Sequence, residues 1–323
     1  MLASRLALAG ICSLALLVAC GARLHPKGGG KGAQAALDAA GIDVEQVQAG
    51  GRQRNYLIHI PTGYRGEPVP LVFVFHGGGG KAPGIAKTTE YTAVADRENF
   101  IVVFPNGTGQ GGGNNGGYWN AGSGRGEGPA EKANVDDVGF VRAMLDQIEG
   151  KYAVDKRRIY ATGLSKGGMF SYLLACRMSD TFAAVGIVSA TMTAPDCAPS
   201  NPVAILHIHG TADENVPING GAGDLSRDDA NYEPVAKVME FWRTRDKCSA
   251  QTTEKSEAPD TKCYSYTECA GADVKYCVIQ GEGHGWPGAA KLAKWQEQNN
   301  VYITQDFSAT EETWAWFKAH PKP

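Results

Sequence analysis

Hydrophobic residues recur with two alternating periods along the chain from about residue 55 onward. Short runs rich in β-branched and aromatic residues predict strands, and longer stretches with apolar residues three or four apart predict helices. The predicted strands are Tyr56–Ile60, Leu71–Phe75, Ile101–Phe104, Ile159–Thr162, Ala184–Ser189, Val203–Ile208 and Val274–Ile279. The predicted helices are Asp136–Lys151, Gly167–Cys176, Val235–Arg243 and Thr310–His320. This alternation favours a single α/β domain, a mostly parallel sheet flanked by helices on both faces.

The first 33 residues have the pattern of an export signal followed by a flexible tether. Arg5 precedes the apolar stretch Leu6–Ala19, which has 14 residues, fewer than the roughly 20 that a membrane-spanning helix needs. The stretch runs into Leu-Val-Ala-Cys-Gly, which resembles a bacterial lipobox and would make Cys20 the lipidated N-terminus of the mature protein. An ordinary secretory signal cut near Ala22 is the alternative. We predict a signal peptide over 1–19, a tether and lead-in over 20–49, and one folded domain over 50–323.

Both alternatives place the protein outside the cytoplasm, anchored by lipid at the outer surface or in the periplasm, or else secreted. The chain has 31 Lys and Arg against 34 Asp and Glu, a net charge of −3, and no run rich in Lys or Arg. Nucleic acid is therefore not a predicted partner, because its phosphates require a basic surface. A membrane is a predicted partner only through the lipid anchor.

Export also decides how the cysteines are interpreted, because disulfides persist in oxidising compartments. Cys12 leaves with the signal and Cys20 is the lipidation candidate, so six cysteines remain. No CxxC pair is present, so no metal site is predicted. Six cysteines allow 15 pairings, and the sequence alone does not choose among them. The pairing we expect is Cys176–Cys197, Cys263–Cys277 across a hairpin, and Cys248–Cys269.

A Gly-x-Ser-x-Gly motif follows the predicted strand Ile159–Thr162 and precedes a predicted helix. In this context the motif is typical of a nucleophile elbow, which presents Ser165 at the carboxyl end of a sheet and at a helix N-terminus. Gly163 and Gly167 are needed because a side chain at either position would meet neighbouring backbone in so sharp a turn. Taken alone, the motif also occurs by chance in glycine-rich chains.

A serine hydroxyl needs a base to become a nucleophile, and the base needs an orienting acid. The predicted acid is Asp213, which follows the strand Val203–Ile208, with Glu214 as the alternative. Of the seven histidines, His284 and His320 lie beyond the acid, and the glycine-flanked His284 is the predicted base. His207 and His209 alternate on one strand and are interpreted as core or site-wall residues.

The predicted strand Leu71–Phe75 runs into a histidine and four glycines, His76 to Gly80. This segment resembles the oxyanion loop of esterases, in which backbone N–H groups bind the negatively charged oxygen of the tetrahedral intermediate. The expected donors are Gly77, Gly78 and Lys166. The Lys166 side chain could in addition favour acidic esters.

Two glycine-rich segments resemble nucleotide-binding motifs but lack their context. A phosphate loop ending at Lys81 would need glycine at position 75 and Ser or Thr at position 82, where Phe75 and Ala82 stand. The Gly-x-Gly-x-x-Gly run that starts at Gly107 continues into more glycine and asparagine instead of opening a helix. No cofactor is therefore predicted.

Taken together, the motifs HGGGG, GLSKGG, HGTAD and GEGHGWPG stand in the order that an esterase requires. With Tyr118-Trp119-Asn120, they resemble the exported esterases that group polyhydroxybutyrate depolymerase-like proteins, LpqC-type lipoproteins and type-one feruloyl or acetylxylan esterases. The resemblance covers about residues 50–320. It implies an α/β-hydrolase fold, a triad of Ser165, Asp213 and His284, and no cofactor. The chain departs from polymer-degrading depolymerases, which usually add a linker and a substrate-binding domain.

The predicted activity is a serine carboxylesterase that cleaves feruloyl or acetyl esters of plant polysaccharide through an acyl-enzyme. Trp119, Met169 and Trp286 are the candidates for the wall of the acyl pocket. A polyhydroxyalkanoate or its oligomers are the alternative substrate, and a peptidase on the same fold is a further possibility. A surface-anchored binding protein without catalysis is the alternative of another class, which the complete set of motifs argues against.

Overall fold

The computed structural model describes residues 37–38, 40–109, 116–123, 128–226, 230–291 and 294–323. The predicted signal peptide, the lipidation candidate Cys20 and the first part of the tether lie outside these residues. No helix of the described part is long and apolar enough to span a membrane.

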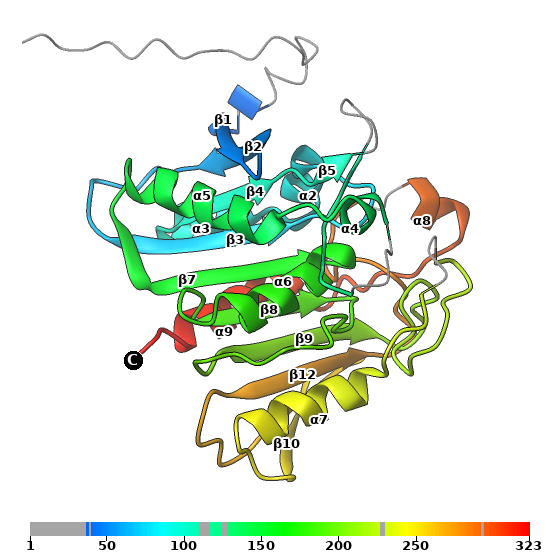
Figure 1. The fold of residues 1–323 in the computed structure, drawn as a ribbon. Coiled ribbons are helices and arrows are strands. Elements are labelled where there is room, and N and C mark those ends of the chain that lie inside the picture. Colours follow the sequence, from blue (N-terminus) through cyan, green and yellow to red (C-terminus); the bar gives the residue numbers. More distant parts are fainter. Residues whose placement is uncertain (1–36, 39, 110–115, 124–127, 227–229, 292–293) are drawn as a thin grey trace, which may run out of the picture.

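One twisted sheet of ten strands forms the centre of the described structure (Figure 1). Its strands are β1 Ile42–Ala49, β2 Arg52–His59, β3 Val69–Phe75, β4 Ile101–Pro105, β7 Val154–Leu164, β8 Ala184–Val188, β9 Ala204–Gly210, β10 Thr252–Ala258, β11 Thr261–Tyr266 and β12 Val274–Ile279. They lie in the order β1-β2-β4-β3-β7-β8-β9-β12-β11-β10. The six strands from β4 to β12 are parallel, and antiparallel pairs extend both edges.

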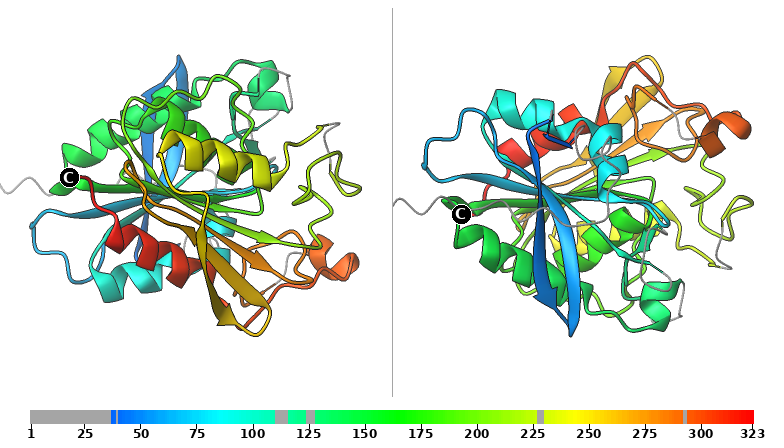
Figure 2. Two further views of the ribbon diagram at one scale, coloured as in Figure 1. Left: turned by 90° about the horizontal axis from the view of Figure 1, so that it is seen from below. Right: turned by 90° about the horizontal axis from the view of Figure 1, so that it is seen from above.

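Helices cover both faces of this sheet, as the alternating pattern predicts (Figure 2). On one face lie α5 Asp137–Glu149, α6 Lys166–Arg177 and α7 Val235–Arg245. On the other lie α2 Ala82–Thr89, α3 Tyr91–Glu98 and α9 Ala309–Ala319. Alternate side chains of β3 enter two separate cores, because neighbouring residues of a strand point to opposite faces. The short helices α4 Pro129–Lys132 and α8 Lys294–Gln298 lie beyond the carboxyl ends of the parallel strands (Figure 1).

All seven predicted strands and all four predicted helices are present, and their ends differ by a few residues. Helix α5, for example, begins within one residue of the predicted start at Asp136, because the Asp136 side chain caps it by accepting a 2.7 Å hydrogen bond from the backbone N–H of Gly139. Five strands of the described structure are not predicted by the pattern. β1, β10 and β11 lie at or next to the edges of the large sheet, and β5 Thr108–Gly109 and β6 Gly117–Tyr118 form a separate two-stranded sheet. Strand β1 also means that the sheet begins within the segment interpreted as tether and lead-in.

The expected pairing of all six cysteines is confirmed. Cys176, at the end of α6, is joined to Cys197 in the segment after β8. Cys263 and Cys277 are directly opposite in the β11–β12 pair, and Cys248 is joined to Cys269 beside the same hairpin. The Cys248–Cys269 bond ties the connection between β11 and β12 to the segment after α7, and the Cys263–Cys277 bond links the two strands themselves.

Candidate active site

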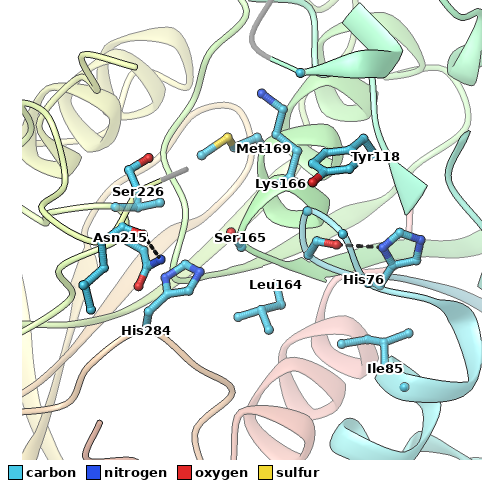
Figure 3. A pocket seen from close by; sticks show the side chains of 18 of the residues that line it. His76, Ile85, Tyr118, Leu164, Ser165, Lys166, Met169, Asn215, Ser226 and His284 are labelled. Carbon is cyan, nitrogen blue, oxygen red and sulfur yellow. Dashed lines mark hydrogen bonds between the residues drawn. The ribbon is translucent and has the colours of Figure 1, made fainter. Parts of the chain in front are cut away.

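The carboxyl ends of four parallel strands bring the predicted motifs to one edge of the sheet. His76 follows β3, Ser165 follows β7, Asp213 lies three residues after β9, and His284 lies five residues after β12. Strand β7 is flanked by β3 and β8, and β9 lies between β8 and β12. The topology therefore places the serine between the glycine loop and the two other predicted triad members (Figure 3).

Ser165 lies in the sharp turn between β7 and α6. Its backbone has φ 56° and ψ −124°, a region that non-glycine residues occupy at an energetic cost. The turn is held from both sides, since the Ser165 N–H donates to the Val188 carbonyl (2.9 Å) and the Ser165 carbonyl accepts from the Met169 N–H (2.9 Å). This is the nucleophile-elbow geometry that the motif predicts.

The two glycines of the motif are required by contact with backbone. A Cβ atom on Gly163 would lie 2.5 Å from the carbonyl of Gly167, and a Cβ on Gly167 would lie 2.6 Å from the carbonyl oxygen of His76. The second contact is with the first residue of the glycine loop. The elbow and the loop therefore approach each other closely enough that only glycine fits between them.

His284 and Asp213 form a buried hydrogen bond, in which Nδ1 of His284 lies 2.8 Å from Oδ2 of Asp213. The other carboxylate oxygen, Oδ1, accepts from the backbone N–H groups of Asn215 and Val216, each at 2.9 Å. Burial alone would raise the pKa of Asp213, but the facing rings of His284 and His209 and their hydrogen bonds outweigh it and hold the pKa well below its usual value. Asp213 is therefore an ionised acceptor, which orients the imidazole.

The other candidates for acid and base do not reach this site. Glu214 is exposed, whereas Asp213 next to it is buried. His320 follows α9 and bonds to Trp316 and Asp273 instead. Of the alternatives left open by the sequence, the structure brings together Asp213 and His284, and both Ser165 and His284 line the same cavity.

The glycine loop is held in place by His76 and by Trp119. Nε2 of His76 accepts a 3.0 Å hydrogen bond from the Gly107 N–H, so Nδ1 carries the proton and donates to the Gly77 carbonyl (2.8 Å). Burial lowers the pKa of His76 to about 4, which keeps the ring neutral in this arrangement. Trp119 donates from its indole N–H to the His76 carbonyl (2.9 Å).

The hydrogen bonds within the loop show which of its N–H groups are already engaged by carbonyls. The N–H groups of Gly79 and Gly80 are engaged by the carbonyls of Gly117 and Gly77, each at 2.9 Å. Gly77 lies beside the serine, since a Cβ on it would stand 3.3 Å from the Cβ of Ser165, and a Cβ on Gly78 would stand 3.8 Å from the Cβ of Lys166. The N–H of Lys166 is in the first turn of α6, where helical N–H groups have no partner within the helix.

The side chain of Lys166 does not point at the oxyanion position. It is buried, its ammonium lies 3.2 Å from Oε1 of Glu131 in α4, and Figure 3 shows it pointing away from Ser165. Glu131 also bonds to the Ser123 hydroxyl. The carboxylate balances the lysine charge, which removes the reason for Lys166 to favour acidic esters.

A cavity of about 1110 Å³ opens above Ser165. Its described lining is mostly polar or small, with the glycine loop, asparagines, Tyr118 and Tyr232 as well as Ser165 and His284. Met169 lines it, as expected.

Trp119 and Trp286 are not in the described lining, so their prediction as pocket walls is wrong. Trp119 is fully buried, and its ring stacks on Phe170 with centroids 5.3 Å apart. Trp286, two residues after His284, is buried and donates from its indole N–H to the Thr310 hydroxyl (2.9 Å). Each satisfies its single polar group inside the protein, which allows so large a ring to be fully buried.

Glu282, two residues before His284, is a further buried acid that the sequence pattern does not single out. Its Oε2 accepts from the Thr304 N–H (3.1 Å), while among the described residues Oε1 has no hydrogen-bond partner. Burial, and to a smaller extent the charges of Asp260 and Asp213, raise the pKa of Glu282 to about 8. With Glu282 protonated and neutral, Asp213 is the ionised carboxylate that accepts the hydrogen bond from His284.

Replacing Glu282 with glutamine is expected to make stability less dependent on pH. In the unfolded chain the carboxyl has its ordinary pKa of 4.5, so between about pH 4.5 and 8 the folded protein binds a proton that the unfolded chain does not. Stability therefore falls as the pH rises through this window. Between pH 5.5 and 8.5 the wild type should lose about 3 kcal/mol more than Glu282→Gln, since one pKa unit is worth about 1.4 kcal/mol.

Urea unfolding at the two pH values, with disulfides intact, measures this difference. Glu214→Gln is the matched control, because it removes a neighbouring but exposed carboxyl. Equal pH dependence in wild type and Glu282→Gln would show that Glu282 is ionised in the folded protein.

Comparisons with known proteins agree with this geometry. A family model described as "Esterase PHB depolymerase" matches residues 54–218, half of the chain. The protein NocK of Nocardia uniformis subsp. tsuyamanensis, which is named as an esterase, is 30% identical over 75% of this chain and 73% of its own length. Feruloyl esterase B of Piromyces equi is 28% identical over 72% of this chain, and the match spans 42% of that enzyme.

The solved structures include acetyl xylan esterase from Aspergillus awamori, which has the same fold with a TM-score of 0.54. The two chains are 14% identical, and the alignment covers 80% of this chain and 98% of the other. The mostly parallel sheet, the serine elbow at its carboxyl edge and the match of the family model agree with one another. The chain belongs to the esterase PHB depolymerase family and is a carboxylic ester hydrolase.

Proposed function

We propose that the protein is an exported serine esterase that uses Ser165 as nucleophile, His284 as general base and acid, and Asp213 as orienting acid. The observation that carries the proposal is the buried 2.8 Å bond between His284 and Asp213, in the cavity that also contains Ser165 on its strained turn. The bond fixes the proton on Nδ1 of His284. Nε2 is thereby left as the basic atom for the serine proton.

The reaction follows from this arrangement in two halves. Oγ of Ser165 attacks the ester carbonyl carbon while Nε2 of His284 takes its proton, and the carbonyl oxygen becomes an oxyanion. The N–H groups of the glycine loop and of Lys166 stabilise that oxygen. His284 then gives its proton to the leaving alcohol, and the acyl group stays on Ser165. Water, deprotonated by His284, releases the acid and restores the serine.

The proposed substrates are feruloyl or acetyl esters of plant polysaccharide. Relatives named as feruloyl and acetylxylan esterases support this class. The cavity also suits it, because its lining includes Asn215, Asn231 and Asn299, whose amides are of the kind that binds sugar hydroxyls. The same lining includes Leu164, Met169 and Val216, which offer apolar contact to an acyl group.

Oligomers of a polyhydroxyalkanoate are the second candidate substrate, favoured by the description of the matching family model. Such an ester would place its repeating acyl units in the same cavity and would use the same Ser165, His284 and Asp213. The two candidates differ in the leaving alcohol, which is a sugar in one case and a hydroxyacyl unit in the other.

Export and lipid attachment at Cys20 belong to the same proposal. Three disulfides within the described residues fit a protein that matures in an oxidising compartment. On this proposal residues 1–19 are removed, the tether leads from the anchor, and the catalytic domain works on substrates outside the cytoplasm.

The first experiment compares hydrolysis of methyl ferulate, p-nitrophenyl butyrate and 3-hydroxybutyrate oligomers by the mature protein. A pocket that fits the feruloyl group should give a kcat/KM for methyl ferulate within about tenfold of the activated ester, since steric rejection by a pocket costs about 10- to 200-fold. Activity on the oligomers without ferulate activity would move the substrate to polyhydroxyalkanoates. No hydrolysis of any of the three would contradict the assignment of the site.

A further inference from the structure

A chain of hydrogen bonds runs through the core from Tyr172 in α6 to the catalytic carboxylate. The Tyr172 hydroxyl lies 2.8 Å from Nδ1 of His207, and Nε2 of His207 lies 3.0 Å from Nδ1 of His209. Nε2 of His209 then lies 2.8 Å from the Val216 carbonyl oxygen and 3.3 Å from Oδ2 of Asp213. Tyr172 and both histidines are buried, and the two imidazoles lie nearly parallel with centroids 5.2 Å apart.

With both imidazoles neutral, the Val216 carbonyl at the catalytic end sets the direction of every hydrogen bond in this chain. The Val216 carbonyl only accepts, so Nε2 of His209 carries the hydrogen and, in a neutral ring, Nδ1 accepts. His207 must then donate from Nε2 and accept at Nδ1, which leaves the Tyr172 hydroxyl as donor. Burial raises the pKa of Tyr172 and lowers that of His207 well away from their ordinary values, so the phenol keeps its proton and the imidazole stays neutral.

His209 supports Asp213 by two routes. Directly, its Nε2–H is shared with Oδ2, the same oxygen that accepts from His284. Indirectly, it holds the carbonyl of Val216, and the N–H of Val216 donates to Oδ1 at 2.9 Å. Both oxygens of the carboxylate therefore depend on one buried imidazole.

We propose that His209 is a positioning residue for the ester hydrolysis, and that Tyr172 and His207 complete the chain of hydrogen bonds that holds its ring in place against Asp213. This inference rests on the proposed function, because it assigns His209 to the support of the proposed triad. The chain is anchored in rigid elements: Tyr172 lies in the middle of α6, whose first residue follows Ser165, and both histidines lie on β9. The support for the acid thus comes from the same helix that carries the nucleophile.

The test compares two substitutions at His209 with one at a matched position. His209→Leu removes the donor to Asp213, whereas His209→Gln keeps an amide N–H near the place of Nε2. His59→Leu is the control, because His59 is also buried on a strand with two partners, Gly41 and Asp96, but lies near the opposite edge of the sheet. Each folded variant is assayed for kcat and KM on p-nitrophenyl butyrate, and its thermal unfolding is recorded.

We expect His209→Leu to lower kcat by about 10- to 100-fold with little change in KM, because misplacement of a catalytic group by about 1 Å costs this much. His209→Gln should recover most of the loss, and His59→Leu should keep the wild-type kcat even if it unfolds at lower temperature. Equal kcat in His209→Leu and His59→Leu would overturn the proposal. So would a loss confined to KM, or a glutamine variant no better than leucine.

If His209→Leu does not fold, Tyr172→Phe tests the same proposal. It leaves Nδ1 of His207 without its donor and so loosens the far end of the chain. Its control is Tyr91→Phe, which removes a fully buried hydroxyl bonded to Thr313 in the core on the other face of the sheet. A lower kcat in Tyr172→Phe alone supports the proposal, and equal kcat in the two variants overturns it. Asp213→Asn is assayed in parallel. If this variant is fully active, the assignment of the triad is wrong, and so is the inference that rests on it.

Discussion

Ser165→Ala is expected to lower kcat by about 10⁶-fold, as removal of the nucleophile does in other serine hydrolases. Among the described residues that line the cavity, Ser165 is the serine at the tip of the β7–α6 turn, with φ at 56° and with glycines on both sides whose Cβ atoms would meet backbone. The residual activity would come from the oxyanion donors and substrate binding. Burst kinetics with p-nitrophenyl butyrate measure the effect and show whether an acyl-enzyme accumulates in the wild type.

The control for this variant is Ser171→Ala. Ser171 lies in the same helix, is fully buried and donates to the Gly167 carbonyl at 2.9 Å, but it lies outside the described lining of the cavity. Its loss should reduce stability slightly and leave kcat near the wild-type value. A Ser165→Ala protein that keeps wild-type kcat would refute the nucleophile assignment, because the ester would then be cleaved without this hydroxyl.

The proposed triad and oxyanion loop could be located from the sequence because each part follows a buried strand. Continuous apolar runs such as Leu71–Phe75 mark the parallel strands, and parallel strands must end at the same edge of the sheet. A Gly-x-Ser-x-Gly motif, an acid and a histidine after three such runs therefore meet at that edge. The spacing of the cysteines on the β11–β12 hairpin likewise follows from the opposition of residues across two strands.

Features that depend on side-chain direction could not be located in this way. The motif places Trp119 near the site, but the direction of its indole N–H, toward the carbonyl of His76, puts the ring in the core. Lys166 is next to Ser165 in the sequence, yet its ammonium lies beside the carboxylate of Glu131 in α4. Burial of Glu282 depends on contacts with the segment around Thr304, which no local pattern encodes.

The edge strands were missed for a different physical reason. Strand β10 has exposed residues along most of its length, and β1 alternates only weakly between buried and exposed positions. Such strands are held by their neighbour's backbone and, near β10, by disulfides, so little hydrophobic periodicity is required of them. The hydrophobic pattern predicts the strands and helices that form the core, and the edge strands of this sheet contribute few buried residues to that core.

Asp213→Asn is expected to lower kcat by about 10⁴-fold with KM little changed, because an amide can donate to Nδ1 of His284 and so favour the wrong tautomer. The native carboxylate accepts from His284 at 2.8 Å and from the N–H groups of Asn215 and Val216. An asparagine in this place keeps the shape but loses the charge that stabilises the imidazolium. The measurement is kcat and KM on p-nitrophenyl butyrate, with circular dichroism to check folding.

Glu214→Gln is the matched control for the acid, because it removes the adjacent carboxyl, which is exposed. Wild-type kcat in this variant, together with the loss in Asp213→Asn, would assign the acid to one of two neighbouring carboxylates by function as well as by geometry. The reverse result, a large loss at Glu214 alone, would require the loop after β9 to rearrange during catalysis. The four hydrogen-bond donors within 3.3 Å of the Asp213 carboxylate, from Asn215, Val216, His209 and His284, argue that it does not, since such a rearrangement would leave a buried charge unpaired.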